Sequence, residues 1–301
     1  MIEMLKATLE EYCDSISYIL SKASIDEALI NKPGNASRVK DITSVNFSDI
    51  LYSALLMKRY YKEACKRKFD KKYESLYDLL YYAIVKSKEL NINFSIFGTS
   101  MQLLPIAYSS SYSLSDTLLK ASQVILSLNN KDSYFFSLAL RELNLSYLGK
   151  MEVMDYRELE KYTLYDIFLK SSEIDSAVRN MVLNYRYSLE VIEEIKNKGL
   201  EEGVLYSFIK ILCEVPDGLI LRKYGAYTAI RVSQLACSIL KNYSLKRIKD
   251  FDDFLVKNRY NPGSTADIIA TGIGLYYLDE WYKKNSLGYT STLQRGCDRF
   301  S

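Results

Sequence analysis

Glycine and proline are scarce in this chain, and their scarcity restricts the folds open to it more than any other feature. The 301 residues include 12 Gly and only 4 Pro, well below average usage. Strand-rich folds need many turns built on these two residues, whereas long helices joined by short polar loops do not. The composition therefore predicts an all-α fold.

Apolar side chains recur at spacings of three and four residues along most of the sequence, which is the period of an amphipathic helix. In the first such stretch, Leu9, Ile16 and Leu20 fall on one face. We find neither a repeat nor a linker-like stretch, so we expect a single domain over residues 1–301 with a loosely held tail at 285–301. The expected helices span residues 3–30, 47–68, 73–90, 98–111, 114–129, 132–148, 163–172, 174–198, 201–213, 219–241, 245–257 and 265–284.

The charges of the chain are nearly balanced, with 40 basic and 37 acidic residues and a formal charge of +3. This balance predicts neither a nucleic-acid partner nor a membrane-surface partner. A basic cluster between Lys58 and Lys68 is interpreted as a solvated helix face, with phosphate or RNA binding as the alternative. The longest apolar run, residues 268–278, is too short to cross a membrane.

Histidine is absent, and the five cysteines include no CxxC pair. The absence of histidine excludes histidine-based triads, metal sites and acid–base catalysis. Carboxylates are then the expected groups for proton transfer. The first residues are charged and amphipathic, unlike a signal peptide. We therefore expect free thiols and a cytoplasmic location.

The prolines all lie in segments that interrupt the helical pattern, at residues 31–41, 97–105, 215–225 and 261–267. These segments combine turn-forming residues, nearby Arg, Lys or Asp, and the start of a helix. A helix N-terminus attracts anions, and Arg and Lys suit phosphate oxygens. Asp can hold a Mg²⁺ ion that bridges those oxygens. The segments therefore predict a phosphate-binding cleft built from loops that are distant in sequence.

Three of these segments resemble motifs of the triphosphoribosyl-dephospho-CoA synthase family, helical enzymes that serve citrate lyase and malonate decarboxylase. The matching stretches are PGNASRVKD at 33–41, PDGLILRKYG at 216–225 and NPGSTADIIA at 261–270, with a fainter match around Asp175, Asn184 and Tyr185. The resemblance covers residues 28–278. The chain departs from the family pattern in several places: Phe94 and Ser95 stand in place of an Asn-Thr pair, and Gly218 stands in place of Thr. Better-studied members also carry a His and an acid soon after the first motif, where this chain has residues 44–49, SVNFSD.

The resemblance implies a transferase that moves the triphosphoribosyl group of ATP to the 2′-hydroxyl of dephospho-CoA and releases adenine, with Mg²⁺ accompanying ATP. Such a transfer passes through an oxocarbenium-like state, with the departing base protonated and the acceptor hydroxyl deprotonated. Two alternatives stay open: a related phosphoribosyl-type transfer to another acceptor, such as a pterin, and a non-catalytic helical nucleotide-binding protein. The expected partners are therefore small molecules, and a homodimer is an open question.

On this interpretation the candidate site residues come from the first, third and fourth segments. The catalytic and metal-binding candidates are the carboxylates Asp41, Asp217 and Asp267. The candidates for contact with triphosphate and ribose are Asn35, Arg38, Lys40, Arg222, Lys223, Asn261, Ser264 and Thr265. Each candidate also has a structural interpretation, namely surface ion pairing for the cations, helix capping for the acids and turn formation for the asparagines.

Overall fold

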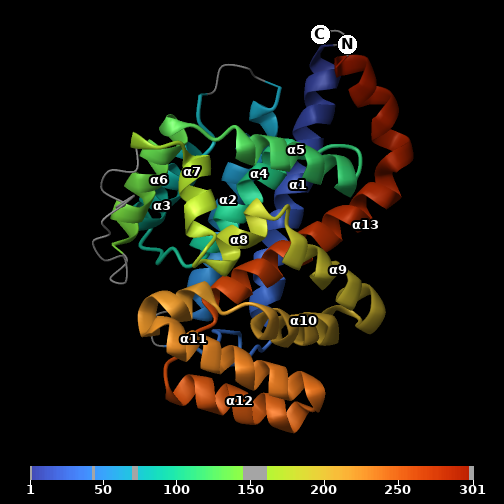
Figure 1. Cartoon of the computed structure of the whole chain (residues 1–301). Coiled ribbons are helices and arrows are strands. Elements are labelled where there is room, and N and C mark those ends of the chain that lie inside the picture. Colours follow the sequence, from blue (N-terminus) through green and yellow to red (C-terminus); the bar gives the residue numbers. More distant parts are fainter. Residues whose placement is uncertain (1, 43–44, 70–73, 145–160, 298–301) are drawn as a thin grey trace.

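The computed structural model of the chain describes residues 2–42, 45–69, 74–144 and 161–297 (Figure 1). Within these ranges it contains thirteen helices and no sheet, which confirms the all-α prediction. The helices are α1 (Ile2–Leu29), α2 (Phe47–Arg67), α3 (Asp78–Glu89), α4 (Phe97–Ser109), α5 (Leu114–Leu126), α6 (Asn130–Leu143), α7 (Leu164–Ser171), α8 (Ser176–Val182), α9 (Arg186–Lys198), α10 (Leu200–Glu214), α11 (Gly218–Lys241), α12 (Leu245–Lys257) and α13 (Gly263–Cys297).

The first and last long helices, α1 and α13, pack against each other in the middle of the molecule (Figure 1). Buried apolar side chains form two clusters, and both helices contribute to each. From α13, Leu275 and Leu278 belong to the larger cluster, whereas Ile268 and Ile273 belong to the smaller one. The single-domain organisation remains a prediction, and these shared helices support it.

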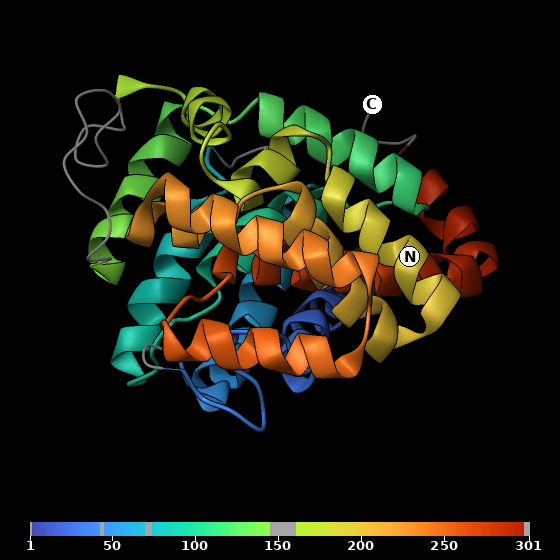
Figure 2. The same ribbon diagram turned by 60° about the horizontal axis from the view of Figure 1, so that its bottom comes forward.

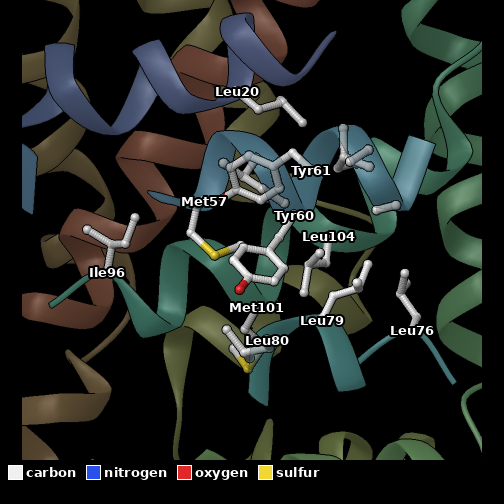
Figure 3. Close-up of a cluster of buried hydrophobic side chains, with 14 of the residues drawn as sticks. Leu20, Met57, Tyr60, Tyr61, Leu76, Leu79, Leu80, Ile96, Met101 and Leu104 are labelled. Atoms are coloured by element: carbon white, nitrogen blue, oxygen red, sulfur yellow. The ribbon is translucent and has the colours of Figure 1, made fainter. Parts of the chain in front are cut away.

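In the larger cluster, α2 contributes one of its faces. Met57 and Tyr61 are one helical turn apart and are both buried, so they face the same side. Leu20 of α1, Leu80 of α3 and Leu104 of α4 are buried with them (Figure 3). Burial of this apolar area is the main stabilising contribution that fixes α2 between its neighbours.

The smaller cluster joins α9, α10, α11 and α12 to the N-terminal half of α13. Figure 2 shows α11 and α12 running alongside each other over this part of the molecule. Gly225 interrupts α11 with φ +83°, a left-handed conformation that glycine adopts at little cost. The residues before this kink form the first turns of α11 and contain Arg222 and Lys223.

Several helix boundaries differ from the sequence-based expectation, among them the start of α3 at Asp78 and the end of α6 at Leu143. The helix expected at 174–198 is divided into α8 and α9 at Asn184 and Tyr185, whose φ angles are +53° and +61°. Tertiary contacts support the break, because the Tyr185 hydroxyl donates to the Gln102 carbonyl oxygen at 2.8 Å. In addition, α13 continues to Cys297 through residues expected to form a loose tail, and residues 298–301 lie outside the described ranges.

The prediction of free thiols is wrong for four of the five cysteines. Cys13 of α1 is bonded to Cys65 of α2, and Cys213 of α10 is bonded to Cys237 of α11. The partners lie 52 and 24 residues apart. They come from separate helices, so the sequence spacing carried no signal of the pairing. The side chain of Cys297 lies outside the described residues.

The basic cluster on α2 faces acidic side chains on α1. Lys62 and Lys66 each lie 2.9 Å from a carboxylate oxygen of Glu10, and Lys58 lies 3.4 Å from Asp14. These contacts favour the interpretation of the cluster as an ion-paired helix face. Among the described residues, the helices are either too short or too polar to cross a bilayer.

Candidate functional site

A cavity of about 590 Å³ lies among the described residues. Its walls include the end of α1, the loop after it, and the starts of α4, α8, α11 and α13, and side chains of α6 and α7 also line it. All four proline-containing segments contribute residues to it. The polar side chains that line it are Glu27, Asn35, Asn93, Ser95, Thr99, Asn144, Ser171, Asp175, Arg222, Lys223, Asn261, Ser264 and Asp267.

The first and fourth segments are in direct contact. The Asn35 amide donates to Asn261 Oδ1 at 2.7 Å, and both residues line the cavity. Gly34 has φ +74°, and a Cβ atom there would lie 2.7 Å from the Tyr260 carbonyl oxygen. Only glycine therefore fits this close approach. Asn35 Oδ1 is buried and has no hydrogen-bond partner within the described part of the chain, so a donor on a ligand would satisfy it.

The third and fourth segments are joined through Asp217, which is fully buried. Its Oδ1 accepts from the N–H groups of Leu219 and Ile220 at 2.9 and 3.0 Å and so caps α11. Its Oδ2 accepts from both the N–H and the hydroxyl of Thr265 at 2.8 Å. Burial raises the pKa of Asp217, and these donors oppose the rise. Neither Asp217 nor Thr265 lines the cavity, so both act as a structural junction.

Replacement of Asp217 by Ala is expected to lower the free energy of unfolding by about 2–4 kcal/mol, because it removes a helix cap and leaves buried donors unsatisfied. Urea titration followed by circular dichroism measures this change. The exposed Asp41, which accepts one N–H group, provides a matched control whose replacement should cost no more than about 1 kcal/mol. An Asp217→Ala variant with unchanged stability and lost turnover would contradict the structural assignment.

Asp267 is the predicted carboxylate that does line the cavity. It lies in the first turns of α13, and its Oδ1 accepts from the Thr99 hydroxyl at 2.7 Å. A Cβ atom on Gly98 would lie 2.1 Å from Asp267 Oδ2, so the second segment fits closely around the carboxyl group. Burial raises the pKa of Asp267 to about 8, and the negative charges of Asp175 and Glu27 add to the rise. At neutral pH this side chain is therefore mostly protonated.

The cations of the third segment also face the cavity. Arg222 forms an ion pair with Oδ2 of Asp175, and Oδ1 of Asp175 accepts from the Ala177 and Val178 N–H groups at the start of α8. Asp175 thus holds the guanidinium in place. Burial lowers the pKa of Lys223, and the neighbouring Arg222 contributes to the decrease.

Three candidates from the first segment do not line the cavity. Arg38 is exposed, and its N–H donates to the Ala28 carbonyl oxygen. Lys40 forms an ion pair with Asp252 of α12. Asp41 is exposed and accepts from the Phe47 N–H at 3.0 Å, at the start of α2. Their predicted contacts with the triphosphate, the metal or the reacting atoms therefore find no support in the geometry.

The structure also identifies cavity residues that sequence reasoning missed. Glu27 belongs to the last turn of α1 and gave no signal beyond an acidic residue in a helix. Thr99 lies in a segment that the prolines did mark, and Asp175 lies at the faint match to the family. Each of these residues lines the cavity because the end of its helix packs there. The spacing of apolar residues along one helix does not show where that helix ends in space, so it could not identify these residues as part of the site.

Two of the departures from the family pattern lie in the cavity wall, at Phe94 and Ser95. Another, Gly218, lies where α11 meets α8. A Cβ atom there would lie 2.8 Å from the Asp175 Cα atom. Glycine at this position therefore permits the close packing that brings Asp175 to Arg222.

The predicted magnesium ligands do not form a protein site. No group of three or more acidic, histidine or cysteine side chains suited to a metal ion is found among the described residues. Both oxygens of Asp217 are occupied by hydrogen-bond donors, and Asp41 lies outside the cavity. Asp267 is the single carboxylate of the three that lines the cavity, and its Oδ1 already accepts from the Thr99 hydroxyl. The residues present therefore do not fit a metal ion held by the protein alone.

Comparison with known proteins identifies one family and one solved structure that are similar to this chain. The CitG family, described as ATP:dephospho-CoA triphosphoribosyl transferase, matches residues 13–286. A crystal structure of an Archaeoglobus fulgidus protein, provisionally described as a triphosphoribosyl-dephospho-CoA synthase, superposes with a TM-score of 0.63 at 21% identity. The alignment covers 77% of this chain and 99% of that one, and at this identity it shows the fold alone.

No curated protein matches the chain significantly. The family match, however, spans all four segments that form the cavity. The chain therefore belongs to the ATP:dephospho-CoA triphosphoribosyl transferase family and is a transferase.

Proposed function

We propose that the cavity transfers the triphosphoribosyl group of ATP to the 2′-hydroxyl of dephospho-CoA and releases adenine. The observation that carries the proposal is the pairing, in one cavity, of two cations with a protonated carboxyl group. Arg222 and Lys223 supply the cations from α11, and Asp267 supplies the carboxyl group from α13. A triphosphate and a departing base require groups of these two kinds.

Asp267 acts as the general acid. Its pKa of about 8 keeps the proton available at neutral pH, and a general acid works best when its pKa is close to the operating pH. As the bond between ribose C1′ and adenine breaks, its electron pair moves to the base, and Asp267 protonates a ring nitrogen. The Thr99 hydroxyl fixes the carboxyl group for this transfer.

Arg222 and Lys223 bind the triphosphate. The Arg222 guanidinium is held by Asp175 before the substrate arrives, so little conformational freedom is lost on binding. Asn35 Oδ1 accepts a hydrogen bond from a ribose hydroxyl. Mg²⁺ accompanying ATP would partly neutralise the triphosphate charge without ligands from the described residues. Because ATP is the donor, we place the reaction in the cytoplasm.

The experiment that tests this function measures adenine release from ATP by chromatography, with and without dephospho-CoA. We expect adenine and the transfer product in equal amounts, and release that depends on the acceptor. If ATP stays intact in the presence of dephospho-CoA, the proposed reaction is wrong.

The acceptor deserves a separate test, because Phe94 and Ser95 replace family residues in the cavity wall. Adenine release with a pterin or another hydroxyl-bearing cofactor precursor, and none with dephospho-CoA, would show that the donor chemistry is right and the acceptor is different.

A further inference from the structure

Glu27 lines the cavity and forms a buried ion pair with Lys32, and this pair has no role in the function proposed so far. Lys32, in the turn after α1, has a side chain that is 0% exposed. Its ammonium donates to Glu27 Oε1 at 2.9 Å, to the Ile30 carbonyl oxygen at 2.7 Å and to the Glu27 carbonyl oxygen. Lysine is almost never fully buried without a partner, and here it also satisfies carbonyl groups at the end of α1.

The hydrogen bonds of Lys32 indicate its charge. A lysine ammonium carries three hydrogens, which match the three acceptors, whereas a neutral amine carries only two. Burial raises the pKa of Glu27 and lowers the pKa of Lys32, and the attraction between them opposes both shifts. Lys40 also repels the Lys32 charge. The two carbonyl oxygens can only accept hydrogen bonds, so they favour the ammonium form of Lys32 and, with it, the carboxylate form of Glu27.

Glu27 is the cavity carboxylate that remains able to accept a proton. Lys32 occupies its Oε1, and the structure shows no bond to its Oε2 within the described residues. Asp175, by contrast, uses both oxygens for the α8 cap and Arg222. Asp267 already carries a proton at neutral pH. Asp267 accepts from a neutral hydroxyl, whereas Glu27 contacts an ammonium, and such a difference between two carboxyl groups is the usual basis for a division into acid and base.

We propose that Glu27 is the general base that deprotonates the acceptor hydroxyl, and that Lys32 is a positioning residue that keeps Glu27 ionised and directed into the cavity. The proposal rests on the transfer reaction described above. The hydroxyl proton passes to Glu27, and the oxygen forms a bond to ribose C1′. The bond from C1′ to adenine breaks, and adenine takes the proton of Asp267. The proton gained by Glu27 balances the one lost by Asp267, so the reaction needs no further reagent.

Glu27→Gln tests the role of the base, because it removes the charge and keeps the shape. We expect turnover to fall by roughly 10²–10⁴, with the dissociation constant for ATP unchanged within several-fold. Asp26→Asn is the matched control. Asp26 adjoins Glu27 in sequence but bonds to Lys22 and the Tyr277 hydroxyl and does not line the cavity. We expect this variant to turn over at the wild-type rate.

Azide distinguishes loss of a base from loss of structure. Azide can attack ribose C1′ without giving up a proton, so it needs no general base. In Glu27→Gln, millimolar azide should restore adenine release from ATP and form the triphosphoribosyl azide. It should not do so in Asp267→Asn, because the departing base still lacks its acid. Failure of azide to restore release in a folded Glu27→Gln protein that binds ATP would overturn the proposal.

Lys32→Met tests the positioning role through the pH profile. Loss of the ammonium raises the pKa of Glu27, so the low-pH limb of turnover should move to higher pH. A purely structural role would lower activity without moving that limb. If the single variants fail to fold, the double variant Glu27→Gln with Lys32→Met removes both charges together, which buried pairs tolerate better. It should bind ATP and respond to azide, and a wild-type rate with dephospho-CoA alone would overturn the proposal.

These outcomes are separate from failure of the proposed function. If the wild-type protein releases no adenine with dephospho-CoA, the transfer reaction itself is wrong. If the wild-type protein is active and Glu27→Gln is equally active, only the assignment of Glu27 is wrong.

Discussion

An Asp267→Asn variant is expected to lose turnover by roughly 10²–10⁴, because the amide cannot protonate the departing adenine. Its affinity for ATP should stay within several-fold, since the triphosphate ligands that we propose are Arg222 and Lys223. Single-turnover release of adenine measures the first effect, and isothermal titration with ATP measures the second. A wild-type rate of release in this variant would show that another group supplies the proton.

The pH dependence of turnover supplies an independent test of Asp267. In the wild-type protein turnover should fall as the pH rises through about 8, where the carboxyl group loses its proton. The Asn variant has no proton to lose there, so its residual activity should lack that limb. An unchanged high-pH limb in the variant would assign the limb to a different group.

The same raised pKa affects stability. The folded protein holds the Asp267 proton up to about pH 8, whereas the unfolded chain releases it near its ordinary value of 3.8. Between these two pH values the native state binds more protons, so the free energy of unfolding decreases as the pH rises through this window. Asp267→Asn removes this dependence and should be more stable than the wild-type protein at pH 8.5, as measured by thermal unfolding.

An Arg222→Ala variant is expected to bind ATP roughly 10- to 100-fold more weakly, because a hydrogen bond to a charged group is worth about 1.5–3 kcal/mol. The fold should survive, because Asp175 keeps its two bonds to the start of α8. Equilibrium titration with ATP at fixed ionic strength measures the change, since salt screens the interaction.

Arg38→Ala is the matched control for Arg222, since it removes the same charge from an exposed site outside the cavity. Its ATP affinity should stay within about twofold, as expected for a screened surface charge. If Arg38→Ala weakens ATP binding as much as Arg222→Ala does, the triphosphate extends beyond the cavity wall and the placement based on geometry is wrong.

The helices themselves were largely predictable from the sequence, because each amphipathic stripe records which face of one helix is buried. The prediction was wrong where a buried contact overrode the local pattern. The apolar period runs on past residue 184, yet the chain breaks there, where Asn180 accepts from the Tyr187 and Ser188 N–H groups. The spacing of apolar residues within each helix likewise could not predict the disulfides, because each disulfide joins two separate helices.

The segments that form the site were also predictable, because proline and glycine mark the turns that lead into helix starts. Arg222, Lys223, Asn35, Asn261, Ser264 and Asp267 all line the cavity, as the sequence predicted. The three carboxylates proposed for catalysis, however, looked alike in the sequence. Each is an Asp near a turn and a helix start, and each had a plausible structural role as a cap.

By itself the sequence determined an all-α chain with four turn segments and the family to which they belong. The tertiary structure decided which acids can do chemistry. Asp217 is saturated by donors, including Thr265 from a segment 48 residues away. Asp267 keeps its proton because burial disfavours its charge. Glu27 lies against the buried ammonium of Lys32. The physical reason is that a carboxyl group's protonation depends on the charges, donors and solvent within a few ångströms, and folding alone brings these together.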